Sequence, residues 1–192
     1  LQGINPYEIS HPPLGKLIIA FGIKLFGMAP FGWRFSGTLF GVGMLPVLYV
    51  LLKKMFGGIA VPACGTAIFA FDFMHFTQTR IATIDTYAVF FILLMYLFMY
   101  LYVTGGRLRH LALSGVFFGI GVACKWTCLY AGAGLAVIWL IHWLKLLKDG
   151  CGAKRFIKNC LFCLVFFVAI PCLVYYISYF AYGTARGMHG VG

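Results

Sequence analysis

Acidic residues are the scarcest side chains of this 192-residue chain, which has only four Asp and Glu against fifteen Lys and Arg. Charged residues make up 10% of the sequence and hydrophobic residues 62%, whereas a soluble domain carries about 25% charged residues. So little charge excludes a water-facing surface over most of the molecule. A nucleic-acid-binding protein would need a polar face for its basic residues, which this composition does not supply. An aromatic content of 18% excludes a disordered chain, so the composition predicts an integral membrane protein.

Several familiar signals are also missing. The chain begins at Leu1 without an initiator Met and has no signal peptide, so we expect a fragment of a longer protein. It contains no Walker, GxGxxG, HExxH or GxSxG motif. The seven cysteines lie mostly within apolar runs, which argues against a secreted disulfide framework. Cys160 and Cys163 have metal-ligand spacing but no second pair. The sequence indicates no metal site and no cofactor, although it leaves a divalent metal ion open.

Long apolar runs are plentiful, and they predict an all-α, polytopic membrane protein. A spanning helix needs about 20 mainly apolar residues. Six uncharged runs are candidate spans: 35–52, 55–71, 86–106, 111–124, 126–144 and 159–185. The fourth and fifth runs are short, and we interpret them as two helices that turn around Lys125. Residues 14–28 carry two lysines, so we expect an interfacial helix there on the outer side; the alternative is a seventh span.

Basic residues predict which side of the membrane each loop occupies. When the loops are numbered alternately, nine of the fifteen basic residues fall on one side: Lys53, Lys54, Arg107, Arg109, Lys145, Lys148, Lys154, Arg155 and Lys158. The positive-inside rule makes this the cytoplasmic side. The outer side then receives residues 1–34, the segment around 72–85, Lys125 and Arg186. In a single transmembrane domain over residues 1–192, residues 1–34 would form an external loop and residues 35–185 the transmembrane helices.

The outer side also receives three of the four acidic residues, Glu8, Asp72 and Asp85, together with His11 and His75. Ionisable groups at a membrane boundary are unfavourable and by default indicate a function. The alternative is that they anchor helix ends among lipid headgroups. Three separate loops bring opposite charges to this side, whereas the inner side is almost entirely basic, which favours a functional site.

Two polar segments on the outer side carry a resemblance to a known family. The first runs from Glu8 to Lys16 and the second from Phe71 to Thr86. The chain resembles the protein O-mannosyltransferases and their bacterial relatives, and the landmarks cover nearly the whole chain in family order. These landmarks are His11-Pro-Pro-Leu-Gly-Lys16, Phe31-Gly-Trp-Arg34, Arg80-x4-Asp85 and Lys125-Trp126-Thr127.

The resemblance implies a polytopic GT-C glycosyltransferase of family 39 that uses a polyprenyl-phosphate sugar. Such a reaction needs cations to hold the phosphate as negative charge grows on the leaving oxygen. It also needs a carboxylate to take the proton of the acceptor hydroxyl. The donor phosphate would be bound by cations of the outer side, which are Arg34, Arg80, Lys125, His11 and Lys16.

The acidic candidates depart from the family pattern. The family carries an Asp-Glu pair in its first external loop, and its Asp is regarded as the principal catalytic acid/base. Residues 1–10 contain no such pair, so we expect it upstream of the sequence. Asp85 then resembles a second, supporting acid, and Glu8 could reach the same site. Two roles for Asp72 and His75 agree equally with the sequence: capping of the helix end, and catalysis.

The resemblance further implies inverting transfer of a sugar, most simply mannose, to Ser or Thr of an exported protein at the outer face of the cell membrane. The partners would be the polyprenyl-phosphate sugar, an acceptor protein or peptide and membrane lipids, and not nucleic acid. One alternative is an enzyme that transfers an aminosugar to lipid A, but its Pro-Pro motif follows Lys, so His11 favours the mannosyltransferases. A transporter, which would show inverted repeats and midplane charges, and a structural membrane subunit are alternatives from other classes.

Overall fold

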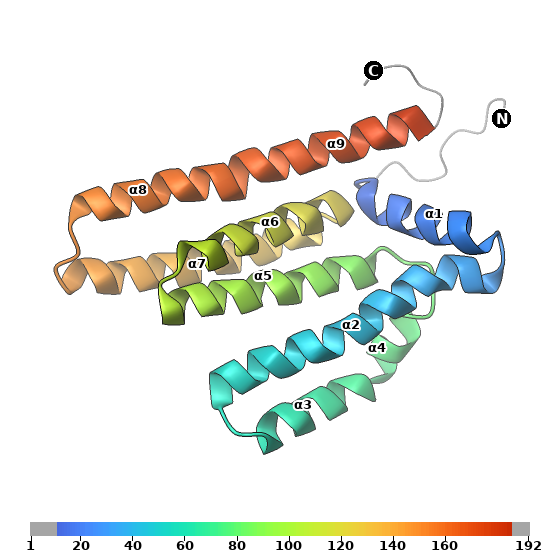
Figure 1. The fold of residues 1–192 in the computed structure, drawn as a ribbon, viewed down its shortest axis with the longest axis horizontal. Coiled ribbons are helices and arrows are strands. Elements are labelled where there is room, and N and C mark those ends of the chain that lie inside the picture. Colours follow the sequence, from blue (N-terminus) through green and yellow to red (C-terminus); the bar gives the residue numbers. More distant parts are fainter. Residues whose placement is uncertain (1–10, 186–192) are drawn as a thin grey trace.

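The computed structural model describes residues 11–185, and every regular element in this part of the chain is a helix (Figure 1). The α-helices are α1 (Leu14–Phe26), α2 (Pro30–Phe56), α3 (Ala60–Ala70), α4 (Phe73–Gln78), α5 (Asp85–Gly105), α6 (Leu108–Cys124), α7 (Thr127–Lys148), α8 (Ala153–Leu164) and α9 (Ile170–Ala185). A π-helical segment, η1 (Val165–Ala169), joins α8 to α9. The expected all-α class is confirmed for the described residues.

Within residues 11–185, four helical segments are long and apolar enough to cross a bilayer: α2, α5, α7 and the continuous helix of α8, η1 and α9. The 27 residues of α2 correspond to a length of about 40 Å. This helix begins at Pro30, where a missing N–H needs no partner. It ends at Phe56, just before Gly57, whose φ of 68° suits glycine. Many large apolar side chains of the described residues are exposed, as expected of a surface that contacts lipid.

Two of the six expected spans are shorter helices. α6 has 17 residues and α3 has 11, and 11 residues give about 16 Å against a hydrocarbon core of about 30 Å. The chain leaves α3 after Ala70 because Asp72 takes extended backbone and caps the next helix, α4. Together, α3 and α4 run back alongside α2 (Figure 1). The run expected as one span over residues 55–71 therefore contains the last residues of α2, a turn and the short helix α3.

α6 confirms the expected turn at Lys125 and contacts its neighbours closely. It ends at Cys124, and α7 begins at Thr127, so the chain turns around Lys125 as expected. Its glycines also allow a close approach to η1 and α9, since a Cβ on Gly115 would lie 2.5 Å from the Phe166 carbonyl oxygen. Small residues at such positions let helix backbones approach in membranes.

α5 lies in the centre of the bundle and contacts α2, α6 and α7. A buried apolar cluster joins α5, α6 and α7: Met95, Met99, Tyr102, Leu111, Phe118 and Leu135. The buried Ser114 hydroxyl donates to the Met95 carbonyl oxygen over 2.8 Å, so this buried polar side chain has a partner. This packing fixes the ends of α5 and α6, from which the candidate site is built.

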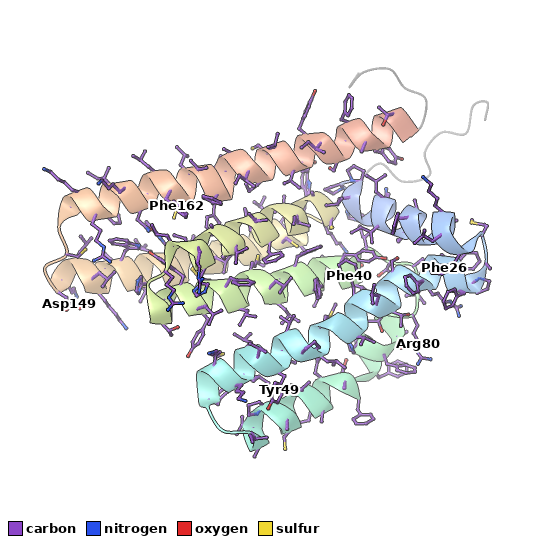
Figure 2. All side chains as sticks on the ribbon, in the orientation of Figure 1. Phe26, Phe40, Tyr49, Arg80, Asp149 and Phe162 are labelled. Carbon is purple, nitrogen blue, oxygen red and sulfur yellow. The ribbon has the colours of Figure 1, made fainter. Side chains whose placement is uncertain are left out.

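The turns of the bundle lie at two opposite ends (Figure 1). The basic end holds the turns at residues 57–59, 106–107 and 149–152, and the site end holds the turns at residues 79–84 and 125–126. Figure 2 shows Asp149 at the basic end and Arg80 at the site end. The charge asymmetry expected from the sequence thus corresponds to two separate ends of one bundle.

α1 packs at the site end. Its 13 residues span about 20 Å, too short to cross a bilayer. Leu14, Ile18 and Ile19 pack on a cluster that includes Ile84 and Cys124. This placement agrees with a short helix that does not span, and its orientation relative to the bilayer plane stays a prediction.

Candidate functional site

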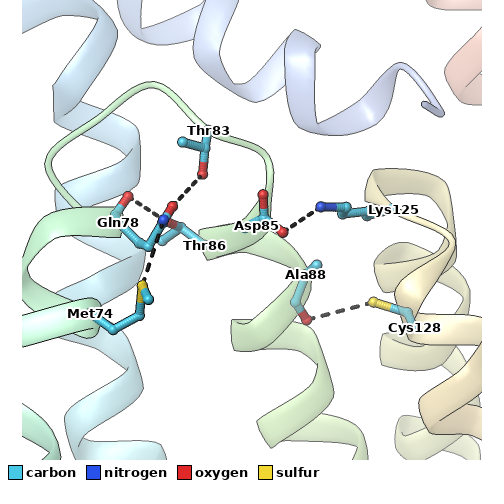
Figure 3. Close-up of polar contacts among 8 residues, drawn as sticks. All are labelled: Met74, Gln78, Thr83, Asp85, Thr86, Ala88, Lys125 and Cys128. Atoms are coloured by element: carbon cyan, nitrogen blue, oxygen red, sulfur yellow. Dashed lines mark hydrogen bonds and ion pairs between the residues drawn. The ribbon is translucent and has the colours of Figure 1, made fainter. Parts of the chain in front are cut away.

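A salt bridge between two turns forms the centre of the candidate site (Figure 3). Asp85 is the first residue of α5, and Lys125 follows the last residue of α6. Lys125 Nζ donates to Asp85 Oδ1 over 2.5 Å, with the Lys125 side chain 19% exposed and the Asp85 side chain 48% exposed. Each charge also suits its helix end, because helix N-termini favour carboxylates and C-termini favour cations. The pair is therefore held in place and still open to a ligand.

Hydrogen bonds hold the loop that leads into Asp85. Thr86 Oγ1 donates to the Gln78 carbonyl oxygen over 2.9 Å, and Thr83 Oγ1 donates to Gln78 Oε1 over 3.3 Å (Figure 3). On the other side of the loop, Thr38 Oγ1 of α2 donates to the Thr79 carbonyl oxygen over 3.2 Å. The loop is thus tied to α2, α4 and α5, which fixes the point where α5 begins.

Arg34 and Arg80 line a hollow of 580 Å³ beside α2. Both arginines are exposed, and the Arg80 guanidinium lies 3.8 Å from the centre of the Phe76 ring, a cation–π contact. The remaining lining is mainly apolar: Pro30, Phe31, Phe35, Thr38, Leu39 and Val42. Two guanidinium groups above an apolar wall suit a phosphate that carries a hydrocarbon chain.

Asp72 and His75 join Asp85 around a smaller pocket of 160 Å³. Asp72 Oδ2 accepts the His75 backbone N–H over 2.8 Å, which is the capping role for the start of α4. The His75 ring packs on Phe69 with ring centres 4.3 Å apart. Partial burial lowers the pKa of His75 below its usual value, and the negative charge of Asp72 opposes that shift. Both residues thus serve the local fold and also face the pocket that Asp85 lines.

His11 and Lys16 lie at the start of α1, and both are partly buried. Leu14, between them in sequence, contacts the cluster that contains Ile84 and Cys124, the sequence neighbours of Asp85 and Lys125. This segment therefore reaches the turns that carry the salt bridge. The candidate Glu8 and the outer-side residue Arg186 lie outside the described residues.

The described candidates all fall at the site end, but they form separate groups. Asp85 and Lys125 are in direct contact, Asp72 and His75 share a pocket with Asp85, and the two arginines share another hollow. Within residues 11–185, no three His, Cys, Asp or Glu side chains lie close enough together to hold a metal ion. Sequence reasoning missed the structural role of Gln78, Thr83 and Thr86, although a threonine-rich segment between two apolar helices was the available signal.

Comparison with known proteins shows which family the chain is similar to. The family model described as dolichyl-phosphate-mannose-protein mannosyltransferase matches residues 10–176. The polyprenol-phosphate-mannose–protein mannosyltransferase of Mycobacterium tuberculosis is 29% identical over 64% of the chain and 28% of its own length. The protein of the same name from Mycolicibacterium smegmatis is 26% identical over 96% of the chain and 42% of its own length. In Saccharomyces cerevisiae, dolichyl-phosphate-mannose–protein mannosyltransferase 5 is 27% identical over 94% of the chain and 28% of its own length.

The chain spans less than half the length of these relatives. The family model nevertheless covers most of the chain, from residue 10 to residue 176. That stretch includes both arginines of the hollow, the Asp85–Lys125 salt bridge and the pocket beside it. The chain therefore belongs to the dolichyl-phosphate-mannose-protein mannosyltransferase family.

Proposed function

We propose that this protein transfers mannose from a polyprenyl-phosphate donor to Ser or Thr hydroxyls of a protein acceptor, with inversion at the anomeric carbon. The observation that carries the proposal is the Asp85–Lys125 pair, with its 2.5 Å contact, at the same end of the bundle as the hollow that Arg34 and Arg80 line. The donor and the sugar are supported by the names of the relatives, which are mannosyltransferases acting with polyprenol- or dolichyl-phosphate-mannose.

The proposed reaction is a single displacement at the sugar. The acceptor oxygen forms a bond to the anomeric carbon while the bond from that carbon to the phosphate oxygen breaks. The phosphate keeps the electron pair, and the acceptor proton passes to a carboxylate. Negative charge grows on the leaving oxygen, so nearby cations stabilise the transition state more than the ground state. Lys125, Arg34 and Arg80 would supply this positive charge.

Asp85 has the supporting role in this scheme. Its carboxylate holds the Lys125 ammonium at the end of α6, so it would orient the cation toward the phosphate. The pocket shared with His75 gives Asp85 a second open side. In the family that the chain resembles, the principal acid/base is the Asp of an acidic pair, and Glu8 is the further acidic candidate of this sequence.

The membrane orientation forms part of the proposal. Since cytoplasmic loops carry an excess of Lys and Arg, we place the basic end in the cytoplasm and the site end on the outer side of the cell membrane. The donor chain would then lie in the outer leaflet, next to the exposed apolar side chains of the helices.

The carboxylate is tested by transfer assays on the full-length protein in detergent, with polyprenyl-phosphate-mannose and a Ser/Thr-containing peptide. Asp85→Asn is expected to lower the transfer rate about 100-fold, in the range for one lost electrostatic or acid–base group. Asp149→Asn is the matched control, because Asp149 lies in a turn at the basic end, and it is expected to keep the wild-type rate. Equal rates for Asp85→Asn and the wild type would remove Asp85 from the site.

A further inference from the structure

A pocket of 540 Å³ opens at the basic end of the bundle, away from the candidate transfer site. It lies where the α5–α6 turn, the last turns of α7 and the first turns of α8 meet, as Gly106, Trp143 and Arg155 in its lining show. The proposed sugar transfer makes no use of this pocket, so its chemistry needs a separate explanation.

Positive charge is concentrated on one wall of this pocket. Arg155, Lys158, Asn159 and Phe162 are three or four residues apart on α8, so they share one helix face, and all four line the pocket. Lys154 adds a third cation at the start of the same helix. Such cations are unfavourable there, because a helix N-terminus already carries partial positive charge. An anion bound in the pocket would relieve this repulsion.

The described part of the chain supplies no such anion. The first turn of α8 contains no acidic residue, and its cap residue is Gly152, which has no side chain that could accept a hydrogen bond from the first N–H groups of the helix. Among residues 11–185, the recorded salt bridge is that of Asp85 and Lys125 at the opposite end. The Arg155 and Lys158 side chains are exposed, so both are accessible to a ligand from outside the helix bundle.

Aromatic side chains form the floor of the pocket, and hydrogen bonds and ring contacts hold them in place. Asn159 is only 5% exposed, and its Oδ1 accepts the Trp139 indole N–H over 2.8 Å. The buried Trp143 donates its indole N–H to the Tyr102 hydroxyl over 3.1 Å. The Phe156 ring packs on both tryptophans, with ring centres 5.8 Å from Trp139 and 5.4 Å from Trp143. Tryptophans are enriched at the level of the lipid headgroups, which places this pocket at the membrane interface.

We propose that this pocket binds the phosphate headgroup of an anionic phospholipid. Arg155 and Lys158 bind the phosphate, and the apolar part of the lining, Leu108, Leu146 and Phe162, receives the start of the acyl chains. Leu108 is 48% exposed, so this apolar wall continues onto the surface that contacts lipid. Basic pockets between transmembrane helices are known to hold such headgroups. The proposal concerns lipid binding and does not depend on the sugar transfer.

Native mass spectrometry of the full-length protein in neutral detergent tests this site. Phosphatidylglycerol, phosphatidylcholine and inorganic phosphate are titrated in separate arms. We expect saturable binding of phosphatidylglycerol in preference to phosphatidylcholine, and the double variant Arg155→Ala/Lys158→Ala should bind phosphatidylglycerol about 10-fold more weakly. The matched control is Lys53→Ala/Lys54→Ala, which removes two exposed cations at the end of α2, at the same end of the bundle, that do not line the pocket, and it should keep the wild-type affinity.

Three results would overturn the proposal. Equal binding of the two phospholipids would show that the headgroup charge is not recognised. An equal loss of phosphatidylglycerol affinity in the two double variants would show that the lipid is attracted to the basic surface in general and not to a defined site. Competition by inorganic phosphate at the concentrations at which phosphatidylglycerol binds would show a site for a free anion. An unchanged melting temperature of the Arg155→Ala/Lys158→Ala variant in phosphatidylcholine would confirm that it is folded, so weaker binding would then support the site.

Discussion

At the scale of residues, the site end shows how two side chains 40 positions apart become one chemical unit. Asp85 begins α5 and Lys125 follows α6, and the packing of these two helices brings their ends together at 2.5 Å. The sequence placed both residues on the same side of the membrane by loop alternation. It could not pair them, because the pairing depends on how α5 and α6 are rotated and offset against each other.

Lys125→Ala is expected to lower mannose transfer about 100-fold, because it removes a cation proposed to stabilise the leaving phosphate. Lys125→Arg keeps the charge and should restore part of the rate. The melting temperature should change little, since partly exposed salt bridges contribute little to stability. Initial rates and thermal unfolding in detergent check both expectations, and a Lys125→Ala protein with the wild-type rate would contradict the proposed role.

A buried hydrogen bond offers a test of the fold at the site end. Tyr87 is 1% exposed, and its hydroxyl lies 2.8 Å from the Ser36 hydroxyl, which joins α5 to α2. Tyr87→Phe leaves Ser36 without this partner and should lower the unfolding free energy by about 1 kcal/mol. Tyr130→Phe is the control, because Tyr130 is 76% exposed. Equal stabilities of the two variants, measured by unfolding in detergent, would contradict the packing of α2 on α5.

At the scale of elements, the contact of α6 with η1 and α9 depends on glycine. A Cβ on Gly115 would meet the Phe166 carbonyl oxygen at 2.5 Å, so Gly115→Ala must push two helices apart. We expect a loss of about 1–3 kcal/mol in unfolding free energy from this overpacking. Gly105→Ala is the matched control, since nothing lies within 4 Å of the added methyl group. If both alanine variants unfold like the wild type, the close approach of α6 is wrong.

The elements also show what sequence patterns can and cannot predict. The turn between α6 and α7 was predictable, because Lys125 interrupts an apolar stretch that is too long for one span. The break between α3 and α4 was not, since it depends on the Asp72 carboxylate reaching the His75 N–H. The π-helical η1 just before Pro171 also has no apolar signature of its own. Runs of apolar residues predict that a helix is present better than they predict where that helix begins and ends.

At the scale of the whole molecule, charge distinguishes the two ends of the bundle. The turns at 106–107 and 149–152 lie at the basic end, and the loop at 79–84 lies at the site end. Because this separation agrees with loop alternation, the sequence could predict which described candidate residues lie at the same end of the bundle. The division of the candidates into a salt bridge, a small pocket and an arginine hollow could not, since it depends on side-chain directions in packed helices.

Cysteine labelling checks the membrane orientation. In a cysteine-free variant on intact cells, Ala82→Cys should react with a membrane-impermeant maleimide, because Ala82 is exposed in the loop at the site end. Asp149→Cys, exposed at the basic end, should react only after the membrane is permeabilised, as the positive-inside rule requires. The reverse labelling pattern would place the site end in the cytoplasm.

The transfer rate of the double variant Arg34→Ala/Arg80→Ala tests the central claim most directly. These two arginines line one hollow at the site end, whereas Arg107→Ala/Arg109→Ala removes two exposed arginines at the basic end. With polyprenyl-phosphate-mannose as donor, the first variant should lose at least about 100-fold in rate, as expected for lost phosphate-binding cations, and the second should transfer mannose at the wild-type rate. Transfer at the wild-type rate by Arg34→Ala/Arg80→Ala, or an equal loss in both variants, would contradict a phosphate site at this end of the bundle.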